Sequence, residues 1–238
     1  MIALPEMQGQ LGNQMFQYSA MRAAALKYNT DIYYSKEYQI NEVFKLAETG
    51  VFVGNFLLYS EPEFSYTEIP LLSKNMVLRG FFQSEKYFKD FEEEIRKDFI
   101  FKSPSFSDVE WLDAISLHVR RGDYLKTPGY HPVCPMDYYV KALEIMPKVK
   151  IIVFSDDISW CKNNFVGDRF SFSENRTNNQ DLEYMSKCKN HIIANSSFSW
   201  WGAWLGNYNG ITVAPKTWFG PEPNLDTKDI IPEEWIVL

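Results

Sequence analysis

The sequence has few cysteines and histidines, and neither residue is spaced as in a metal or redox motif. Its three cysteines are odd in number and form no CxxC pair, which predicts free thiols in a reducing compartment. The three histidines form no cluster, and the adjacent carboxylates of Asp156 and Asp157 do not naturally point at one cation. We therefore expect a site that uses no metal ion and no bound cofactor.

Long hydrophobic runs and an excess of positive charge are also absent. No run of about 18 apolar residues occurs, as a membrane-spanning helix would need, and the start of the chain lacks the regions of a signal peptide. The formal net charge is −7 and no long basic stripe occurs, which argues against a general nucleic-acid binder and makes any anion site local. These features predict a cytoplasmic protein without a transmembrane segment.

The chain does contain ample core material and, after residue 112, a regular alternation of strand and helix patterns. Its residues are 45% hydrophobic and 16% aromatic, as in a globular protein. Such alternation predicts βαβ units with a parallel sheet, and hence an α/β fold. The expected strands are 115–119, 150–154, a short one near Phe170, 191–194 and 211–214, and the expected helices are 136–146, 158–165, 181–188 and 198–205.

The first of these strands ends in two arginines, in the string ISLHVRRGD. Alternating apolar and polar residues predict a strand with one apolar face, with His118 and Arg120 together on the other. Ligands of open α/β sheets bind outside the carboxyl ends of strands, where Arg120 and Arg121 could receive a diphosphate. Asp123 could hold the Arg120 guanidinium rigid. The alternative is an edge strand whose arginines face water.

Polar residues follow two other predicted strands at the point where each ends. Ser155 and Asp156 follow the strand that ends at 154, and 195–197 (Asn-Ser-Ser) follow the strand that ends at 194. Because the carboxyl ends of parallel strands meet at one edge, we expect all three groups on one rim, where a helix start favours phosphate. Each group alone is explained by helix capping, but three together favour a nucleotide-diphosphate site.

The N-terminal half is less regular. Its first 35 residues predict a strand, a glycine turn at 9–14, a helix with Asn13 as N-cap, and a second strand. The glycine spacing alone indicates a tight turn without a ligand. Further expected features are a strand over 76–82, a helix from Ser84 to about Phe99 and a linker at 102–107. We therefore divide the chain into domains 1–105 and 106–238.

Six strings, spread nearly from end to end, carry a family resemblance. They are GQLGNQMFQY at 9–18, GFFQSEKYF at 80–88, HVRRGDY at 118–124, SDD at 155–157, DL at 181–182 and NSSFSWWG at 195–202. Together they resemble glycosyltransferase family 11, the bacterial-type α-1,2-fucosyltransferases, and HxRRGD is specific to fucosyltransferases that use GDP-fucose. The chain is shorter than typical members, with the missing length in the N-terminal half and at the C-terminus.

The resemblance implies a GT-B fold, in which two Rossmann-like domains face a cleft and the C-terminal domain holds GDP-β-L-fucose without metal. It implies inverting transfer of L-fucose to the 2-hydroxyl of the terminal galactose of an oligosaccharide, by a cytoplasmic enzyme whose peripheral attachment to the inner membrane is left open. The donor-binding residues implied are Gly12, Asn13, His118, Arg120, Ser155, Asp156, Asp181, Asn195, Ser196, Ser197 and Phe198.

The resemblance also implies roles for these residues. Arg120 contacts the β-phosphate, which makes it the main catalytic group. His118 and Asp181 lie at the nucleoside end, near guanine, and Ser155 and Asp156 line the donor pocket. Residues 196–198 contact the phosphates, and Asn13 lies near the sugar.

Several alternatives stay open. The acceptor proton could pass to His131, in the loop after the arginine turn, to Asp123, although a bracing role for Asp123 is favoured, or to the leaving phosphate. Three other functions compete with this one. The protein could use another donor or linkage, it could bind a sugar nucleotide without turnover, or it could be a non-enzymatic, aromatic-rich interaction module.

Overall fold

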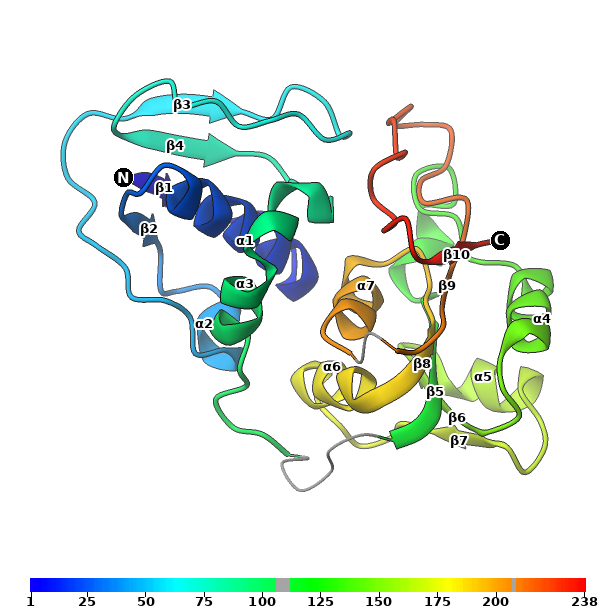
Figure 1. Cartoon of the computed structure of the whole chain (residues 1–238). Helices are drawn as coiled ribbons and strands as arrows, with labels where there is room; N and C mark the ends of the chain where they lie inside the picture. The colour runs from blue at the N-terminus through cyan, green and yellow to red at the C-terminus, as the bar shows by residue number, and fades with distance from the viewer. Residues whose placement is uncertain (106–111, 207–208) are drawn as a thin grey trace. The chain divides into compact units, whose positions relative to one another are not determined.

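The computed structural model describes residues 1–105, 112–206 and 209–238, and it divides into two compact units (Figure 1). The first unit comprises Met1–Ser103 and Leu225–Pro232, and the second comprises Pro104–Asn224 and Glu233–Leu238. The expected boundary between 105 and 106, with the end of the expected linker, falls at residues outside the described ones, so it stays a prediction. The sequence did not predict that residues 225–232 belong to the first unit.

A parallel four-stranded sheet lies at the centre of the first unit, in the order β2-β1-β4-β3. Its strands are β1 (Ile2–Leu4), β2 (Ile32–Tyr34), β3 (Leu57–Ser60) and β4 (Met76–Arg79). The long helix α1 (Leu11–Lys27) is buried along most of its length, and the short helix α2 (Ile40–Val43) follows β2. The largely exposed β3 lies where no periodic pattern predicted a strand.

The predicted helix over 84–99 is wrong in its first half. The chain there forms two 3-10 turns, η1 (Glu85–Tyr87) and η2 (Lys89–Phe91), before α3 (Glu92–Asp98). Between the turns, Phe88 has φ −139° and ψ 2°, and its ring is buried beside Phe16. Burial of that ring therefore overrides the helical period. Ser84 caps the first turn, as expected.

A parallel six-stranded sheet lies at the centre of the second unit, in the order β10-β9-β8-β5-β6-β7. Figure 1 shows α6 and α7 on one side of this sheet and α4 and α5 on the other. The strands are β5 (Leu112–Val119), β6 (Lys150–Ser155), β7 (Phe170–Phe172), β8 (Cys188–Ile192), β9 (Thr212–Ala214) and β10 (Ile236–Val237). The helices are η3 (Asp123–Lys126), α4 (Met136–Ile145), α5 (Ile158–Asn164), α6 (Asn178–Lys187) and α7 (Ser197–Trp204).

The expected alternation of strands and helices is confirmed, although several boundaries shift and the short β10 was not predicted. Helix α6 begins at Asn178, three residues early, because Thr177 forms a capping box with Gln180. Strand β8 runs over 188–192 instead of 191–194. Among the described residues, no helix is both long and apolar enough to cross a membrane.

Strand β5 lies between β8 and β6, and Val119 at its end pairs with Ser155 at the end of β6. The apolar face that the sequence predicted for β5 is confirmed, because Ile115, Leu117 and Val119 lie together in one hydrophobic core. Ser116 and His118, on the other face, are buried as well. Helices cover both faces of a parallel sheet, so polar side chains at these positions need partners inside the unit. Ser116 has one, since its Oγ lies 2.8 Å from Nδ1 of His191.

Candidate active site

Arg120 lies in the turn that follows β5, between two carboxylates. Its Nη2 is 2.6 Å from Oδ1 of Asp123, and its Nη1 is 2.9 Å from Oδ2 of Asp156. Its guanidinium carbon also lies 5.2 Å from the centre of the Tyr124 ring. The expected bracing contact from Asp123 is therefore present, and a second one comes from the turn after β6. Together they hold a half-buried cation in one orientation.

Asp156 also fixes the backbone of the arginine turn. Its Oδ1 accepts a hydrogen bond from the Arg121 N–H at 2.9 Å. A Cβ at Gly122 would lie 2.5 Å from Asp156 Oδ2, so only glycine leaves room for this carboxylate. The turns after β5 and β6 are thus joined by one side chain.

Arg121 has different partners from Arg120. Its Nε is 3.1 Å from Oδ2 of Asp157, and its guanidinium carbon lies 4.1 Å from the ring centre of Trp160. The Asp157 carboxylate also caps α5 by accepting from the Trp160 N–H. Arg121 therefore braces the start of α5, and a shared role of both guanidinium groups in anion binding stays a prediction.

Both adjacent carboxylates of the SDD string are thus paired with arginines rather than directed at a common point. Within the described parts of the chain, no group of three or more His, Cys, Asp or Glu side chains could hold a metal ion. Ser155, the first residue of the string, accepts a hydrogen bond from the Asp157 N–H at 2.9 Å. Its hydroxyl helps to shape this turn.

The turn after β8 is joined to the arginine turn through Tyr124, whose hydroxyl donates to the Asn195 carbonyl at 3.0 Å. The Asn195 side chain is directed inward, and its Nδ2 donates to the carbonyls of Pro132 and Trp218, both at 2.9 Å. Its Oδ1 accepts from the thiol of Cys134 at 3.4 Å. Since both amide donors are used in this way, Asn195 is a structural residue that anchors neighbouring loops, and its expected contact with a ligand is not supported.

Ser196 precedes the first turn of α7, which starts at Ser197. Ser196 makes no side-chain capping bond, and the first turn has no acidic residue. The N–H groups of this turn and the positive end of the helix dipole form an electropositive start at the same sheet edge. Next along the helix, the Phe198 ring lies 5.9 Å from the ring of His118.

His118 is a neutral imidazole inside this edge. Burial, and then the nearby charge of Arg120, lowers the pKa of His118 to about 3. Its Nδ1 has no hydrogen-bond partner in the described part of the chain. Since an unpaired buried nitrogen is costly, this atom is suited to a polar group of a ligand.

His131 lies close to the arginine turn through Tyr124. The two rings are stacked, with centres 4.6 Å apart and planes 11° from parallel. Burial lowers the pKa of His131, and its Nδ1 has no partner among the described residues. The imidazole is therefore neutral at neutral pH and available as a base.

Asp181 reaches the same sheet edge from α6. Its Oδ1 accepts a hydrogen bond from the Ser173 hydroxyl at 2.5 Å, and the Ser173 N–H donates to the Val153 carbonyl just beyond the end of β7. Burial raises the pKa of Asp181. In sheet order, the edge thus presents polar groups after β8, β5, β6 and β7.

Gly12 and Asn13 belong to the first unit, and Asn13 is not the N-cap that the sequence predicted. Gln10 occupies the N-cap position, because α1 begins at Leu11. The Oδ1 of Asn13 accepts instead from Nε2 of Gln83 at 2.8 Å.

Sequence reasoning assigned no function to Tyr124 or Gln83, although both lie in the strings used for the family resemblance. The unpaired side-chain atoms and stacked rings that draw attention to them exist only in the folded chain.

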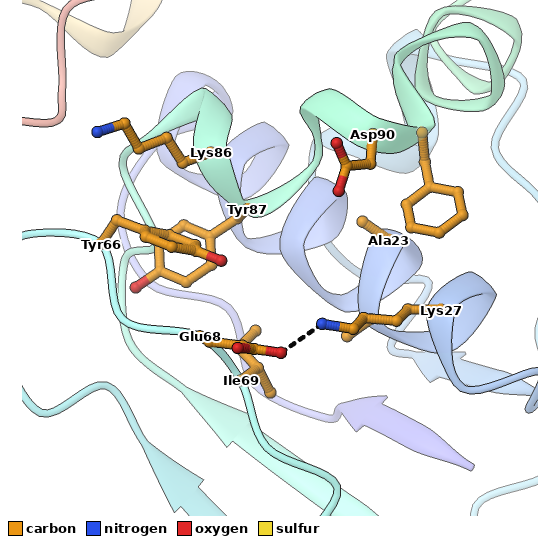
Figure 2. Close-up of a pocket in the computed structure, with 10 residues that line it drawn as sticks. Ala23, Lys27, Tyr66, Glu68, Ile69, Lys86, Tyr87 and Asp90 are labelled. Carbon is orange, nitrogen blue, oxygen red and sulfur yellow. Dashed lines mark hydrogen bonds and ion pairs between the residues drawn. The ribbon is translucent and has the colours of Figure 1, made fainter.

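A separate, open hollow lies in the first unit, lined by α1, the two 3-10 turns, Tyr66, Glu68 and Ile69 (Figure 2). Lys27 and Glu68 form an ion pair there, and the rings of Tyr66 and Tyr87 meet edge-on, with centres 4.9 Å apart. No predicted site residue lines this hollow.

Comparison with known proteins supports the interpretation of the second sheet. Residues 51–238 match the model of glycosyl transferase family 11. An α-1,2-colitosyltransferase from Escherichia coli is 33% identical over 99% of this chain and 98% of its own length. The O-antigen biosynthesis glycosyltransferase WbnK, also from E. coli, is 47% identical over 46% of this chain and 40% of its own length.

Solved structures share the fold at low identity. The NodZ α-1,6-fucosyltransferase soaked with GDP-fucose has a TM-score of 0.54 and 12% identity, covering 86% of this chain and 92% of that one. A mutant of Arabidopsis thaliana FUT1 in complex with GDP has a TM-score of 0.54 and 11% identity, covering 97% and 74%. With its two parallel sheets, the chain therefore has the α/β GT-B fold, as expected. The chain belongs to glycosyltransferase family 11, and it is a fucosyltransferase-like glycosyltransferase that uses a sugar-nucleotide donor.

Proposed function

We propose that this protein transfers L-fucose from GDP-β-L-fucose to the 2-hydroxyl of a terminal galactose, with inversion and without a metal ion. The HVRRGDY and NSSFSWWG strings support the donor. The relative that aligns over nearly the whole chain is named for an α-1,2 linkage. Of two structures with the same fold, one was soaked with GDP-fucose and the other is a complex with GDP.

The observation that carries the proposal is the position of Arg120. Its guanidinium is held by Asp123 and Asp156 at the carboxyl end of the central strand, beside the start of a helix in the same unit. A diphosphate gains negative charge as it leaves the sugar, and a preoriented guanidinium stabilises that charge. The exposed carboxylate of Asp123 could move aside when phosphate arrives, while Asp156 keeps the cation in place.

The remaining residues of the edge divide between the two ends of the donor. The N–H groups at the start of α7 and the hydroxyls of Ser196 and Ser197 would hold phosphate oxygens. The unpaired Nδ1 of His118 and the carboxylate of Asp181 would face the guanine. No step needs a cofactor.

Inversion requires the acceptor hydroxyl to attack the anomeric carbon from the side opposite the diphosphate. His131 is the base that the geometry favours, because its imidazole is neutral and its Nδ1 is unpaired. Asp123 is less suited, since its carboxylate is already paired with Arg120. Proton transfer to the leaving phosphate is the remaining route.

A second donor is favoured by one observation. The relative at 33% identity is named as a colitosyltransferase, and colitose is L-fucose without its 3-hydroxyl. The alignment with that relative spans 287 positions against a chain of 238 residues, so the relative carries residues that this chain lacks.

The test is GDP release and product formation with GDP-fucose or GDP-colitose and β-galactoside acceptors, in the presence of EDTA. Acceptor-dependent release that survives EDTA, with NMR showing an α-1,2 linkage, is the expected result. A higher kcat/KM with GDP-colitose than with GDP-fucose would show that GDP-colitose is the preferred donor. Binding of GDP-fucose without turnover on any galactoside would favour a sugar-nucleotide-binding protein, and loss of activity in EDTA would contradict the metal-independent route.

A further inference from the structure

Gln83 has an unpaired carbonyl oxygen inside the first unit. The residue is 6% exposed, and its Oε1 has no hydrogen-bond partner among the residues that the structure describes. Such atoms are rare in native proteins, because a buried oxygen without a partner has lost its hydrogen bonds to water and gained none. An acceptor kept in this state points to a donor supplied from outside the chain.

The amide of Gln83 is held at the start of α1. Its Nε2 donates to Oδ1 of Asn13 at 2.8 Å, in the first turn of that helix. Gly9 has φ +73°, and a Cβ there would lie 2.2 Å from Nδ2 of Asn13, so glycine leaves room for the Asn13 amide. The helix has no side-chain cap at Gln10 and no acidic residue in its first turn.

The backbone that carries Gln83 is fixed on both sides. Phe82 has φ +52°, a conformation that aromatic residues rarely adopt. The half-buried carboxylate of Glu61 accepts from the N–H groups of Phe81 at 2.8 Å and Phe82 at 3.0 Å. On the other side, Ser84 caps the first 3-10 turn. The Gln83 amide therefore has little freedom to find another partner.

We infer that Oε1 of Gln83 accepts a hydrogen bond from a hydroxyl of a bound sugar, while Asn13 holds the amide in position. This inference rests on the proposed glycosyl transfer, whose donor sugar and acceptor galactoside both carry hydroxyls. A hydroxyl can donate to a carbonyl oxygen, whereas an ionised phosphate only accepts. The start of α1 is therefore a sugar-recognition site, in contrast with the diphosphate site proposed for the second unit.

The test compares the full chain with Gln83→Met, which keeps a similar length and removes both polar atoms. Each protein is assayed with GDP-fucose and its monodeoxy-sugar analogues, and with a methyl β-galactoside and its monodeoxy analogues. In the wild type, one analogue should lower kcat/KM about tenfold to a hundredfold, because it leaves Oε1 unpaired. Gln83→Met should lower kcat/KM for the complete substrate and should no longer discriminate against that analogue.

If discrimination disappears among the donor analogues, Gln83 contacts the transferred sugar. If it disappears among the galactoside analogues, Gln83 contacts the acceptor. Gln17→Met is the matched control, because Gln17 is 1% exposed and its amide bonds to Gln8 and to the Asn13 carbonyl within the chain. It should lower the melting temperature and keep the discrimination. If Gln83→Met does not fold, Gln83→Asn, which withdraws the carbonyl by one methylene, must show the loss instead.

Equal discrimination in the wild type and in the Gln83 variant that folds, for every analogue, would overturn the inference. So would a wild type that treats all the analogues as it treats the complete substrates. Failure of the proposed function is a different result, because the wild type would then transfer no sugar from either donor.

Discussion

One carboxylate fixes the backbone after a strand in each of the two units, but the two carboxylates support different side chains. In the second unit, Asp156 accepts from the Arg121 N–H and pairs with the Arg120 guanidinium. In the first, Glu61 accepts from two N–H groups after β4, and burial raises its pKa. Asp156 thus orients a cation, whereas Glu61 fixes the backbone beside the neutral amide of Gln83. The same local device can therefore prepare a site for an anion or for a sugar.

The largest effect should come from removing the cation. Arg120→Ala should lower kcat about 10²–10³-fold, as expected for the loss of one preoriented group that stabilises a leaving group. Arg120→Lys is the control, because it keeps the charge without the planar fork that contacts two carboxylates. It should recover part of the rate in steady-state assays. Equal rates for the wild type and Arg120→Ala would remove Arg120 from the mechanism.

Glu61→Gln should affect stability more than chemistry. An amide offers one oxygen where the carboxylate offers two, and its NH2 group would face the N–H donors of Phe81 and Phe82. We expect the free energy of unfolding to fall by about 1–3 kcal/mol, measured by urea titration. An unchanged urea midpoint would show that the strained segment holds its shape without the carboxylate.

Asp156→Asn should show the opposite balance. Asparagine keeps an oxygen for the Arg121 N–H and fills the space beside Gly122, but it removes the charge that orients Arg120. We expect kcat/KM to fall about tenfold, as for the loss of one charge-assisted hydrogen bond, with little change in melting temperature. A large loss of stability with normal kinetics would mean that Asp156 acts only on the fold.

The second unit should lose stability in acid because of its buried imidazoles. Burial lowers the pKa of both His118 and His191 to about 3. Below the unfolded pKa of about 6.5, the unfolded chain therefore takes up protons that the folded chain does not, and stability falls by up to about 1.4 kcal/mol per pH unit for each group. Between pH 6.5 and 5, the melting temperature of the wild type should fall more steeply with decreasing pH than that of His191→Gln. An equal pH dependence of the melting temperature in both proteins would contradict a neutral, buried His191.

The smallest effect concerns the acid limb of the rate. If His131 is the base, the acid limb of kcat/KM should lie below pH 6.5, because burial lowers the pKa of His131 and its neutral form persists. Loss of that limb in His131→Gln would assign the ionisation to His131. A limb that is unchanged in the variant would leave proton transfer to the departing phosphate.

Alternating patterns were sufficient to predict five of the six strands of the second sheet, all but β10, and the edge where its polar residues meet. They could not predict which polar side chains turn inward. Asn195 and Ser196 are adjacent and both suit a helix start, yet the Asn195 amide is bonded to Pro132 and Trp218, which are distant in the sequence. Such contacts depend on tertiary packing, and no local pattern records them.

The first unit was harder to predict for the same physical reason. Gln83 lies between two phenylalanines and a run of polar residues, in a string that carries the family resemblance but indicates no chemistry for this residue. Its significance depends on a partner in α1, 70 residues earlier, and on an oxygen left without one. The start of α1 was misplaced because Asn13 is a good cap by composition, whereas the chain uses its amide to bond Gln83.

The segment Leu225–Pro232 has a consequence for how the protein is made. This segment packs with the first unit, where its Asp229 carboxylate pairs with Lys86 and accepts from the Tyr66 N–H. A ribosome therefore synthesises residues 104–224 before the first unit can acquire its last contacts. Nascent chains halted before residue 225 should contain an incomplete first unit and a second unit that still lacks β10. Expression of either unit alone would need a redesigned chain order rather than a simple truncation.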